Sequence, residues 1–179
     1  MPLDPRCTSC GLSGGRRQVV PPSGDLNSCL VLLGEAPGER EDKLGQPFVG
    51  RAGKWLDKCL ADAQLPREKI MITNTVKCRP PDNRRPEPEE VEACMPHLME
   101  DLKGRGLVVA LGSTAIEALL GKKVKVGEVA NQIVDVDFHG LKLKVLLTYH
   151  PSACIYNRDA RVKLAEGLRM AKEYCGITA

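Results

Sequence analysis

Apolar and polar residues alternate along the chain in two distinct patterns. Four short segments are almost continuously apolar and contain many branched residues, which is typical of buried β-strands. These strand candidates are 28–33, 69–76, 107–111 and 142–149. Other segments have apolar residues at every third or fourth position, which predicts helices with one buried face. The helix candidates are 52–63, 91–102, 113–120 and 164–175.

The order of these segments predicts an α/β fold. Strands that alternate with helices form βαβ units, which build a mostly parallel sheet covered on both faces. Residues 133–145 differ, because two strand-like segments flank His139 and Gly140, which predicts a β-hairpin appended to the sheet. In such folds ligands bind beyond the carboxyl ends of the strands. A site is therefore expected in the loops that follow the strand candidates.

Length and composition narrow the function classes. The chain has 179 residues, so we expect residues 1–179 to form a single domain. Hydrophobic residues make up 42% and charged residues 27%, which excludes a disordered chain. The longest apolar runs have five residues, too few for a transmembrane helix. Because the N-terminus has no signal-like apolar stretch, we expect a cytoplasmic protein. The net charge of +3 does not by itself indicate nucleic acid, so a DNA-binding function would need a local basic patch.

Eight cysteines are the most informative part of the composition. In a reducing compartment they are not expected to form a disulfide framework. Cys7 and Cys10 form a CxxC pair whose polar neighbours cannot bury it, and 15 residues separate Cys78 from Cys94. This set favours a metal-type site, and three alternatives stay open: an iron–sulfur cluster, a zinc site, or a CxxC redox pair. A site on these four thiols would order the Arg-rich and Pro-rich loop 79–88.

The other four cysteines have weaker signals. Cys29 begins a strand candidate, and Cys59 and Cys175 lie on apolar helix faces. Free cysteines at such positions commonly behave as small buried hydrophobes. Cys154 follows a His-Pro-Ser turn and could be either a ligand or a small buried hydrophobe.

Polar and aromatic residues follow the strand candidates. Glu35 and Glu41 belong to an acidic run that could supply ligands or a general base, although such runs are more often solvated surface. Phe48 lies in a loop between Pro and Gly, where it could stack on a base or fill the core. Asn74 could pair with an amide edge through one donor and one acceptor, or cap a turn.

The last strand candidate leads into His150-Pro151-Ser152. The proline fixes a turn at this point, and the Ser152 hydroxyl can donate a hydrogen bond to an anion such as phosphate. The two other histidines, His97 on a helix and His139 in a hairpin turn, look structural.

Four blocks of the sequence, taken together, resemble the family 4 uracil-DNA glycosylases, the iron–sulfur type of bacteria and archaea. The blocks are GEAPGERED (34–42), QPFVGRAG (46–53), TNTVKCRPP (73–81) and HPS (150–152). They occur in the family's order, the four-cysteine spacing agrees, and the resemblance covers nearly the whole chain.

This resemblance implies a three-layer α/β/α fold with a central four-stranded parallel sheet. It implies a [4Fe–4S] cluster with a structural role, held by Cys7, Cys10, Cys78 and Cys94. The implied activity is hydrolysis of the N-glycosidic bond of uracil in DNA, which leaves an abasic site. The expected partner is uracil-containing DNA, with no membrane and a monomeric protein. No motif for a sliding clamp is evident at either end.

The resemblance also assigns roles to individual residues. Phe48 would stack on the flipped uracil, and Asn74 would pair with its N3–H and O4, a pattern that cytosine reverses. His150 and the backbone amides of Glu35 and Ala36 would face uracil O2, where negative charge develops as the bond breaks. A neutral His150 that donates one proton would suffice.

Two further active-site roles, for Glu41 and Asn83, come from the same resemblance. Ala36 stands where the better-known family 1 enzymes have the Asp that orients water. Either Glu41 would therefore activate the water, or catalysis would depend mainly on stabilisation of the leaving base. The segment after Ser152 should enter the DNA, with Ile155 or Tyr156 as the wedge.

Three rival functions differ from this interpretation. One is a glycosylase that accepts other deaminated bases, and another is a catalytically silent DNA-binding protein on the same fold. A third is a thiol redox protein built on Cys7 and Cys10. The presence of both Asn74 and His150 favours an active enzyme with uracil as its main substrate.

Overall fold

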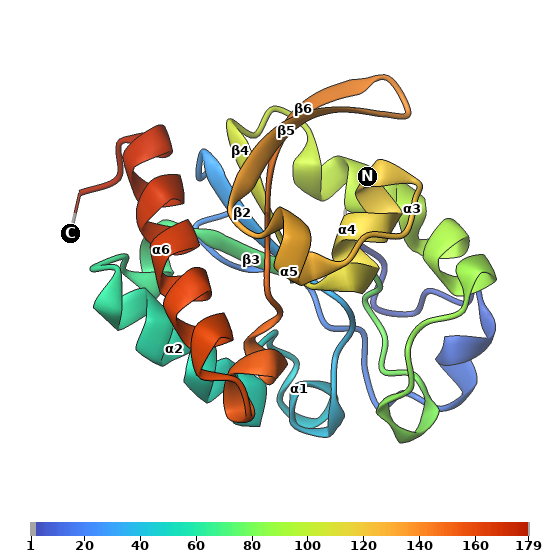
Figure 1. Cartoon of the computed structure of the whole chain (residues 1–179). Coiled ribbons are helices and arrows are strands. Elements are labelled where there is room, and N and C mark those ends of the chain that lie inside the picture. The colour runs from blue at the N-terminus through green and yellow to red at the C-terminus, as the bar shows by residue number, and fades with distance from the viewer. Residues whose placement is uncertain (1–2, 179) are drawn as a thin grey trace.

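A computed structural model of the chain describes residues 3–178. Its β-strands form one sheet in the order β1-β3-β2-β4-β6-β5, seen nearly edge-on among the helices in Figure 1. The strands are β1 (Ser23–Gly24), β2 (Leu30–Gly34), β3 (Met71–Asn74), β4 (Leu107–Leu111), β5 (Gln132–Phe138) and β6 (Leu141–Thr148). The α-helices are α1 (Glu39–Leu44), α2 (Arg51–Asp62), α3 (Pro88–Leu102), α4 (Ser113–Leu120), α5 (Val126–Val129) and α6 (Arg158–Cys175). Single 3-10 turns are η1 (Gly11–Gly14), η2 (Arg67–Lys69), η3 (Pro81–Asn83) and η4 (Pro151–Ile155).

The predicted parallel sheet is confirmed, with two additional strands at its edges. β3, β2, β4 and β6 are parallel neighbours, whereas β1 pairs antiparallel with β3 and β5 pairs antiparallel with β6. The sheet therefore has six strands, not the four that the resemblance implied. β5 is the first strand of the predicted hairpin, and it alternates exposed and partly buried residues because one of its faces meets solvent. β1 has only two residues, too few to leave a sequence pattern.

Two apolar layers cover the sheet. Alternate residues of β2 point to opposite faces, so Leu30 and Leu32 join one layer and Val31 and Leu33 the other. Helices α2 and α6 pack on the first face and α3 and α4 on the second, which gives the expected α/β/α arrangement. In Figure 1, α2 and α6 lie on the left and α3 and α4 on the right.

A disulfide joins Cys29, at the start of β2, to Cys175, at the end of α6. The prediction that both are free buried thiols is therefore wrong. They are 146 residues apart in the sequence, and only the packing of α6 against the sheet brings them together. Cys59 and Cys154 are buried free thiols, in agreement with the simpler interpretation of their positions.

None of the helices within residues 3–178 is long and apolar enough to cross a membrane.

Candidate active site

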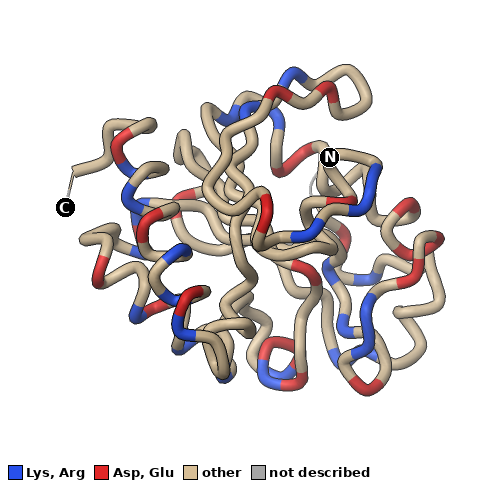
Figure 2. The backbone as a smooth tube through the Cα atoms, viewed as in Figure 1, with Lys and Arg blue, Asp and Glu red and all other residues tan. Residues whose placement is uncertain are grey.

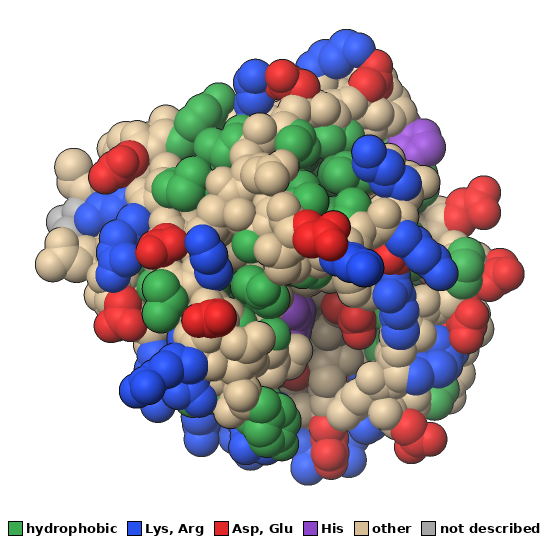
Figure 3. Space-filling model, in the orientation of Figure 1, with side chains coloured by type: hydrophobic (Ala, Val, Ile, Leu, Met, Phe, Trp, Pro, Cys, Tyr) green, Lys and Arg blue, Asp and Glu red, His purple; other side chains and the backbone are tan. Residues whose placement is uncertain are grey.

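The carboxyl ends of the four parallel strands meet at one edge of the sheet, where loops enclose a pocket. β2 leads into the loop that contains Glu35, β3 ends at Asn74, and β6 leads into His150. The space-filling view shows a hollow near the centre of one face, with a histidine side chain visible inside it (Figure 3). The lining contains Glu35, Ala36, Glu41, Phe48, Asn74, Asn83, His150 and Ser152. The fold therefore brings together every non-cysteine residue predicted for the site.

Gly34 lets Asn74 and Phe48 approach each other at the end of β2. A Cβ atom at position 34 would lie 2.5 Å from Asn74 Oδ1 and 2.5 Å from Phe48 Cζ. Any other side chain would therefore push both groups out of place. Asn74 is only 4% exposed, and its Oδ1 atom has no hydrogen-bond partner among the described residues. A buried amide oxygen without a partner is suited to accept a hydrogen bond from a ligand.

Phe48 adopts a left-handed backbone conformation, with φ of 53°, which directs its ring into the pocket. Its ring centroid lies 5.6 Å from that of His150. Arg67 holds the loop from outside, because its guanidinium donates to the carbonyl oxygens of Pro47 and Phe48 at 2.6 and 3.0 Å. No sequence pattern indicates this role of Arg67, since a lysine or arginine in a surface turn is usually solvated.

The hydrogen bonds of His150 determine where its ring proton lies. The backbone N–H of Ser152 donates to His150 Nδ1 at 3.0 Å, and the Ser152 hydroxyl lies 2.8 Å from the same nitrogen. Because an amide N–H can only donate, Nδ1 accepts, and a neutral ring carries its proton on Nε2. Burial lowers the pKa of His150 to about 4, and the carboxylate of Glu41 partly opposes this shift. His150 is therefore neutral at pH 7, with Nε2–H as its only ring donor.

Glu41 organises the loop that faces His150. Its Oε1 accepts from the Gly38 N–H at 2.9 Å, and its Oε2 accepts from the N–H groups of Val49 and Gly50 at 2.9 and 2.6 Å. These bonds tie the start of α1 to the segment that carries Phe48. A carboxylate oxygen has two lone pairs, so Oε1 keeps one acceptor site.

Asn83 enters the pocket from the loop between β3 and α3. It has a φ of 57°, and its Oδ1 accepts from Arg79 Nε at 2.7 Å. The next residue, Arg84, donates to both carboxylate oxygens of Glu90 at the start of α3. Figure 2 shows basic residues along this loop, at the lower right of the molecule.

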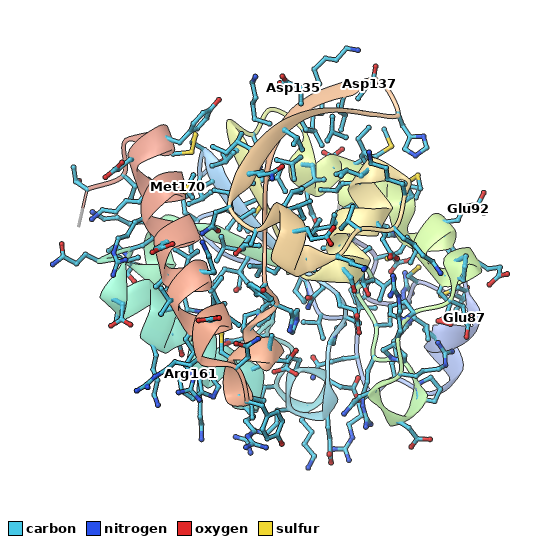
Figure 4. The ribbon with its side chains drawn as sticks, viewed as in Figure 1. Glu87, Glu92, Asp135, Asp137, Arg161 and Met170 are labelled. Atoms are coloured by element: carbon cyan, nitrogen blue, oxygen red, sulfur yellow. A yellow bond between two sulfur atoms is a disulfide. The ribbon has the colours of Figure 1, made fainter. Side chains whose placement is uncertain are left out.

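The turn η4 spans Pro151–Ile155, and Tyr156 follows it directly. The Arg161 guanidinium on α6 supports it, donating to the carbonyl oxygens of Cys154 at 2.6 Å and Ile155 at 3.3 Å. Arg161 is labelled at the lower end of α6 in Figure 4. Tyr156 is 86% exposed, the most exposed large hydrophobic residue in the described chain, whereas Ile155 is partly buried.

Cys7, Cys10, Cys78 and Cys94 line a second cavity, between the N-terminal segment and the start of α3. Apolar residues surround them, among them Leu12 and Val76. No three His, Cys, Asp or Glu side chains within residues 3–178 form a group that could hold a metal ion. The fold nevertheless gathers these four thiols, and no other cysteine, around one cavity.

The charges around the cysteine cavity bear on what it can hold. Burial raises the pKa of Cys94 to about 11 and also raises the pKa of Cys78. A guanidinium nitrogen of Arg16 donates to Cys78 Sγ at 3.3 Å and opposes that shift. Four soft sulfur donors with a nearby cation fit a group that binds thiolates, such as an iron–sulfur cluster.

Comparisons with known proteins agree with this geometry. Residues 21–171 match the family model of the uracil DNA glycosylase superfamily. The chain is 41% identical to the type-4 uracil-DNA glycosylase of Thermotoga maritima, over 94% of this chain and 89% of that protein. It is 38% identical to the type-4 enzyme of Archaeoglobus fulgidus, over 95% and 88% respectively. A type-5 uracil-DNA glycosylase of Pyrobaculum aerophilum is 34% identical, over 88% of this chain and 76% of that enzyme.

The matched residues include all four parallel strands and every pocket residue discussed above, and the type-4 relatives align over nearly the whole chain. The chain therefore belongs to the uracil-DNA glycosylase superfamily, within its type-4 family.

Proposed function

We propose that the protein is a monofunctional uracil-DNA glycosylase, formed by residues 1–179 as a single domain, that starts base excision repair. One observation carries this proposal: a half-buried neutral histidine, a buried amide with an unpaired oxygen and an aromatic ring meet in one pocket. These three groups suit a flat heterocyclic base that donates an N–H to the amide oxygen and has a carbonyl oxygen on which negative charge develops. The type-4 relatives carry the name of this activity.

Uracil must leave the duplex to reach the pocket, at a cost of a few kcal/mol. Phe48 then stacks on the base, and Asn74 Oδ1 accepts from uracil N3–H while its amide N–H₂ donates to O4. Cytosine has an unprotonated N3 and an amino group at these positions, so it would leave the buried Asn74 groups unsatisfied. Such mismatches discriminate strongly between ligands.

The reaction breaks the bond between uracil N1 and C1′ of the sugar. Both electrons leave on the base, water supplies the oxygen that bonds to C1′, and one water proton ends on the released base. The His150 Nε2–H and the backbone amides of Glu35 and Ala36 stabilise the negative charge at O2. One preorganised donor of this kind contributes about 100- to 1000-fold in rate. Because His150 is neutral, it stabilises this charge by donating a hydrogen bond.

Glu41 and Asn83 complete the proposed site. The free acceptor position on Glu41 Oε1 is where we place the water that attacks C1′. The three backbone N–H groups bound to this carboxylate hold it in place, so Glu41 positions the loop as well as the water. Asn83 lies at the other side of the opening and contacts the sugar-phosphate chain.

DNA is held by groups around the opening. Arg79, Arg84 and Arg85 lie on the loop 79–88 and provide the local basic patch that the modest net charge requires. Arg84 and Arg85 also pair with Glu90 and Glu117, which holds them in place. Ser152 lies at the pocket, where its hydroxyl exchanges its contact with His150 for a hydrogen bond to a phosphate. Tyr156 is the wedge that fills the space left by uracil, because it is exposed at the end of η4 and Ile155 is not. The Arg51 guanidinium lies 5.8 Å from the Tyr156 ring and lines the pocket, so the wedge stands beside the opening.

The four cysteines hold a [4Fe–4S] cluster in this proposal. The cluster ties the N-terminal segment to both ends of the loop 79–88 and thereby orders the basic patch and Asn83. Its role is structural, and no chemical step passes through it. A monomeric state and a cytoplasmic location complete the proposal.

The test is cleavage of an oligonucleotide with one uracil, followed by alkali, under single-turnover conditions. His150→Ala should slow excision about 100- to 1000-fold while retaining binding to uracil DNA. His139→Ala, in the hairpin turn, is the matched control and should be unchanged. Excision by His150→Ala within twofold of the native rate would overturn the role of His150. Excision of hypoxanthine by the native protein would identify a broader glycosylase, and no excision by iron-replete protein would identify a silent DNA-binding protein.

A further inference from the structure

Lys77 is a buried charge for which the proposed mechanism has no use. Its side chain is 1% exposed, and it is the largest of the fully buried side chains in the described chain. Lysine is almost never fully buried unless its ammonium group has partners. It lies three residues after Asn74 and directly before Cys78, between the base pocket and the cysteine cavity.

The ammonium group of Lys77 has three partners. Nζ lies 2.5 Å from a carboxylate oxygen of Asp101 and donates to Thr73 Oγ1 at 2.7 Å and to the Asn74 carbonyl oxygen at 2.6 Å. A lysine ammonium has three N–H donors, so this set uses all of them. The Thr73 hydroxyl in turn donates to Asp101 at 3.1 Å, which closes the network.

This network fixes the main chain of Asn74 from behind the pocket. The Asn74 carbonyl binds Lys77, and the next N–H, from Thr75, donates to the Gly34 carbonyl at 2.9 Å. Both polar groups of the Asn74–Thr75 peptide are therefore held, and the Thr75 hydroxyl adds a second bond to Gly34 at 2.8 Å. The peptide plane cannot rotate without breaking a hydrogen bond to a buried charge. The network therefore fixes the backbone from which the Asn74 side chain extends to the pocket.

The same residue contacts the cysteine cavity. The Lys77 backbone N–H forms a hydrogen bond with Cys94, and its ammonium lies near enough to lower the pKa of that thiol against the effect of burial. Lys77 therefore joins the segment that carries two of the four cysteines to the residue that faces the base.

We propose that Lys77, paired with Asp101, is a positioning residue that sets the orientation of the Asn74 amide for reading uracil. This inference rests on the proposed function, because it assumes that Asn74 reads the base. A buried ion pair is weak evidence that its residues are present to stabilise the fold, since apolar replacements of both partners are often tolerated. The hydrogen bond from the Lys77 ammonium to the Asn74 carbonyl, in addition to the ion pair, is what favours a role in recognition. A misplacement of about 1 Å at a reacting group can slow a reaction about 100-fold.

The test is a double-mutant cycle that separates positioning from general structural damage. The pair variant Lys77→Met/Asp101→Asn removes the charge from both partners, so no unpaired buried ion is left. It should slow single-turnover uracil excision about 10- to 100-fold, the range that a shift of up to about 1 Å allows. In an Asn74→Ala background the same pair should change the rate less than twofold, because the group that it positions is gone.

Controls and a second variant keep the outcome decisive. Iron content and melting temperature are measured for each protein. Lys144→Met/Asp135→Asn is the control for the loss of an ion pair, since this pair lies on the β5–β6 hairpin and does not line the pocket. This control should not slow excision at a temperature where it is folded. If the pair variant does not fold, Thr73→Val removes one member of the network with little change in volume. It should slow excision measurably in the native background and not with Asn74→Ala.

Each outcome has a single meaning. Equal slowing by the pair variant in both backgrounds, or no slowing in the native one, would overturn the positioning role of Lys77. A native rate for Asn74→Ala alone would instead refute base reading by Asn74, which belongs to the proposed function. Failure of the positioning role and failure of the proposed function are therefore distinguishable with four proteins: the native protein, the pair variant, Asn74→Ala and the combination of the two.

Discussion

Replacing Gly34 with alanine tests whether the convergence of Asn74 and Phe48 controls the reaction. The added Cβ would lie 2.5 Å from Asn74 Oδ1 and from Phe48 Cζ. Nonbonded carbon atoms prefer about 3.5 to 4.0 Å, so one or both groups must withdraw by about 1 Å. Gly34 does not have a positive φ, so the alanine backbone itself is unstrained and the effect is steric.

The magnitude follows from this displacement. Overpacking of this kind lowers the free energy of unfolding by about 1 to 3 kcal/mol. A shift of about 1 Å in groups that hold the base slows excision about 100-fold. The loss of rate should therefore exceed what the fraction of unfolded protein explains, because most molecules remain folded.

The assay is single-turnover excision of uracil from an oligonucleotide, with the melting temperature measured in parallel. Gly15→Ala is the matched control, since a Cβ there would meet nothing within 4 Å, and it should leave the rate unchanged. A rate for Gly34→Ala within twofold of the native value, in protein shown to be folded, would refute the argument from close approach.

Four other predictions test the histidine, the disulfide and the cysteine cavity. Since burial lowers the pKa of His150 to about 4, the plot of kcat/KM against pH should show no His150 inflection near 6.5, and an activity loss centred at 6.5 would contradict a buried neutral ring. The same pKa shift makes the free energy of unfolding depend on pH. Because the unfolded chain binds the His150 proton more readily than the folded one, stability is lost as pH falls from about 6.5 toward 4. His150→Gln should flatten that part of a plot of melting temperature against pH. Breaking the Cys29–Cys175 disulfide by the double substitution to serine should lower the free energy of unfolding by up to about 5 kcal/mol, given their sequence separation of 146, and an unchanged melting temperature would show that the bridge adds nothing. Cys78→Ser should lose iron and the visible absorbance of a cluster, and full iron content measured after purification would show that the ligand set is wrong.

Local sequence patterns predicted most of the framework. Central strands such as β4 were predicted at their observed bounds, because a strand buried on both faces is apolar throughout. The hairpin of β5 and β6 was also found, since alternation and a His-Gly turn are local signals. β1 was missed because two residues carry no pattern, and its strand form depends on pairing with β3.

The pocket residues were predictable for a related reason. Asn74 is the last residue of β3 and His150 comes two residues after β6, and the carboxyl ends of parallel strands share one edge of the sheet. Lys77 stands inside a motif that was recognised, yet its role was missed. A lysine after a strand is usually exposed, and its burial against Asp101 depends on α3, which begins eleven residues later.

The sequence by itself determined the α/β class, the identity of the pocket residues and the family, because each depends on residue types at short spacing. The tertiary structure decided which groups are buried and which of them meet. It paired Cys29 with Cys175, placed the Lys77 ammonium behind Asn74, and lowered the pKa of His150 by shielding the ring from most of the solvent. These features depend on contacts between segments far apart in the chain and on the local dielectric, and neither leaves a periodic signal in the sequence.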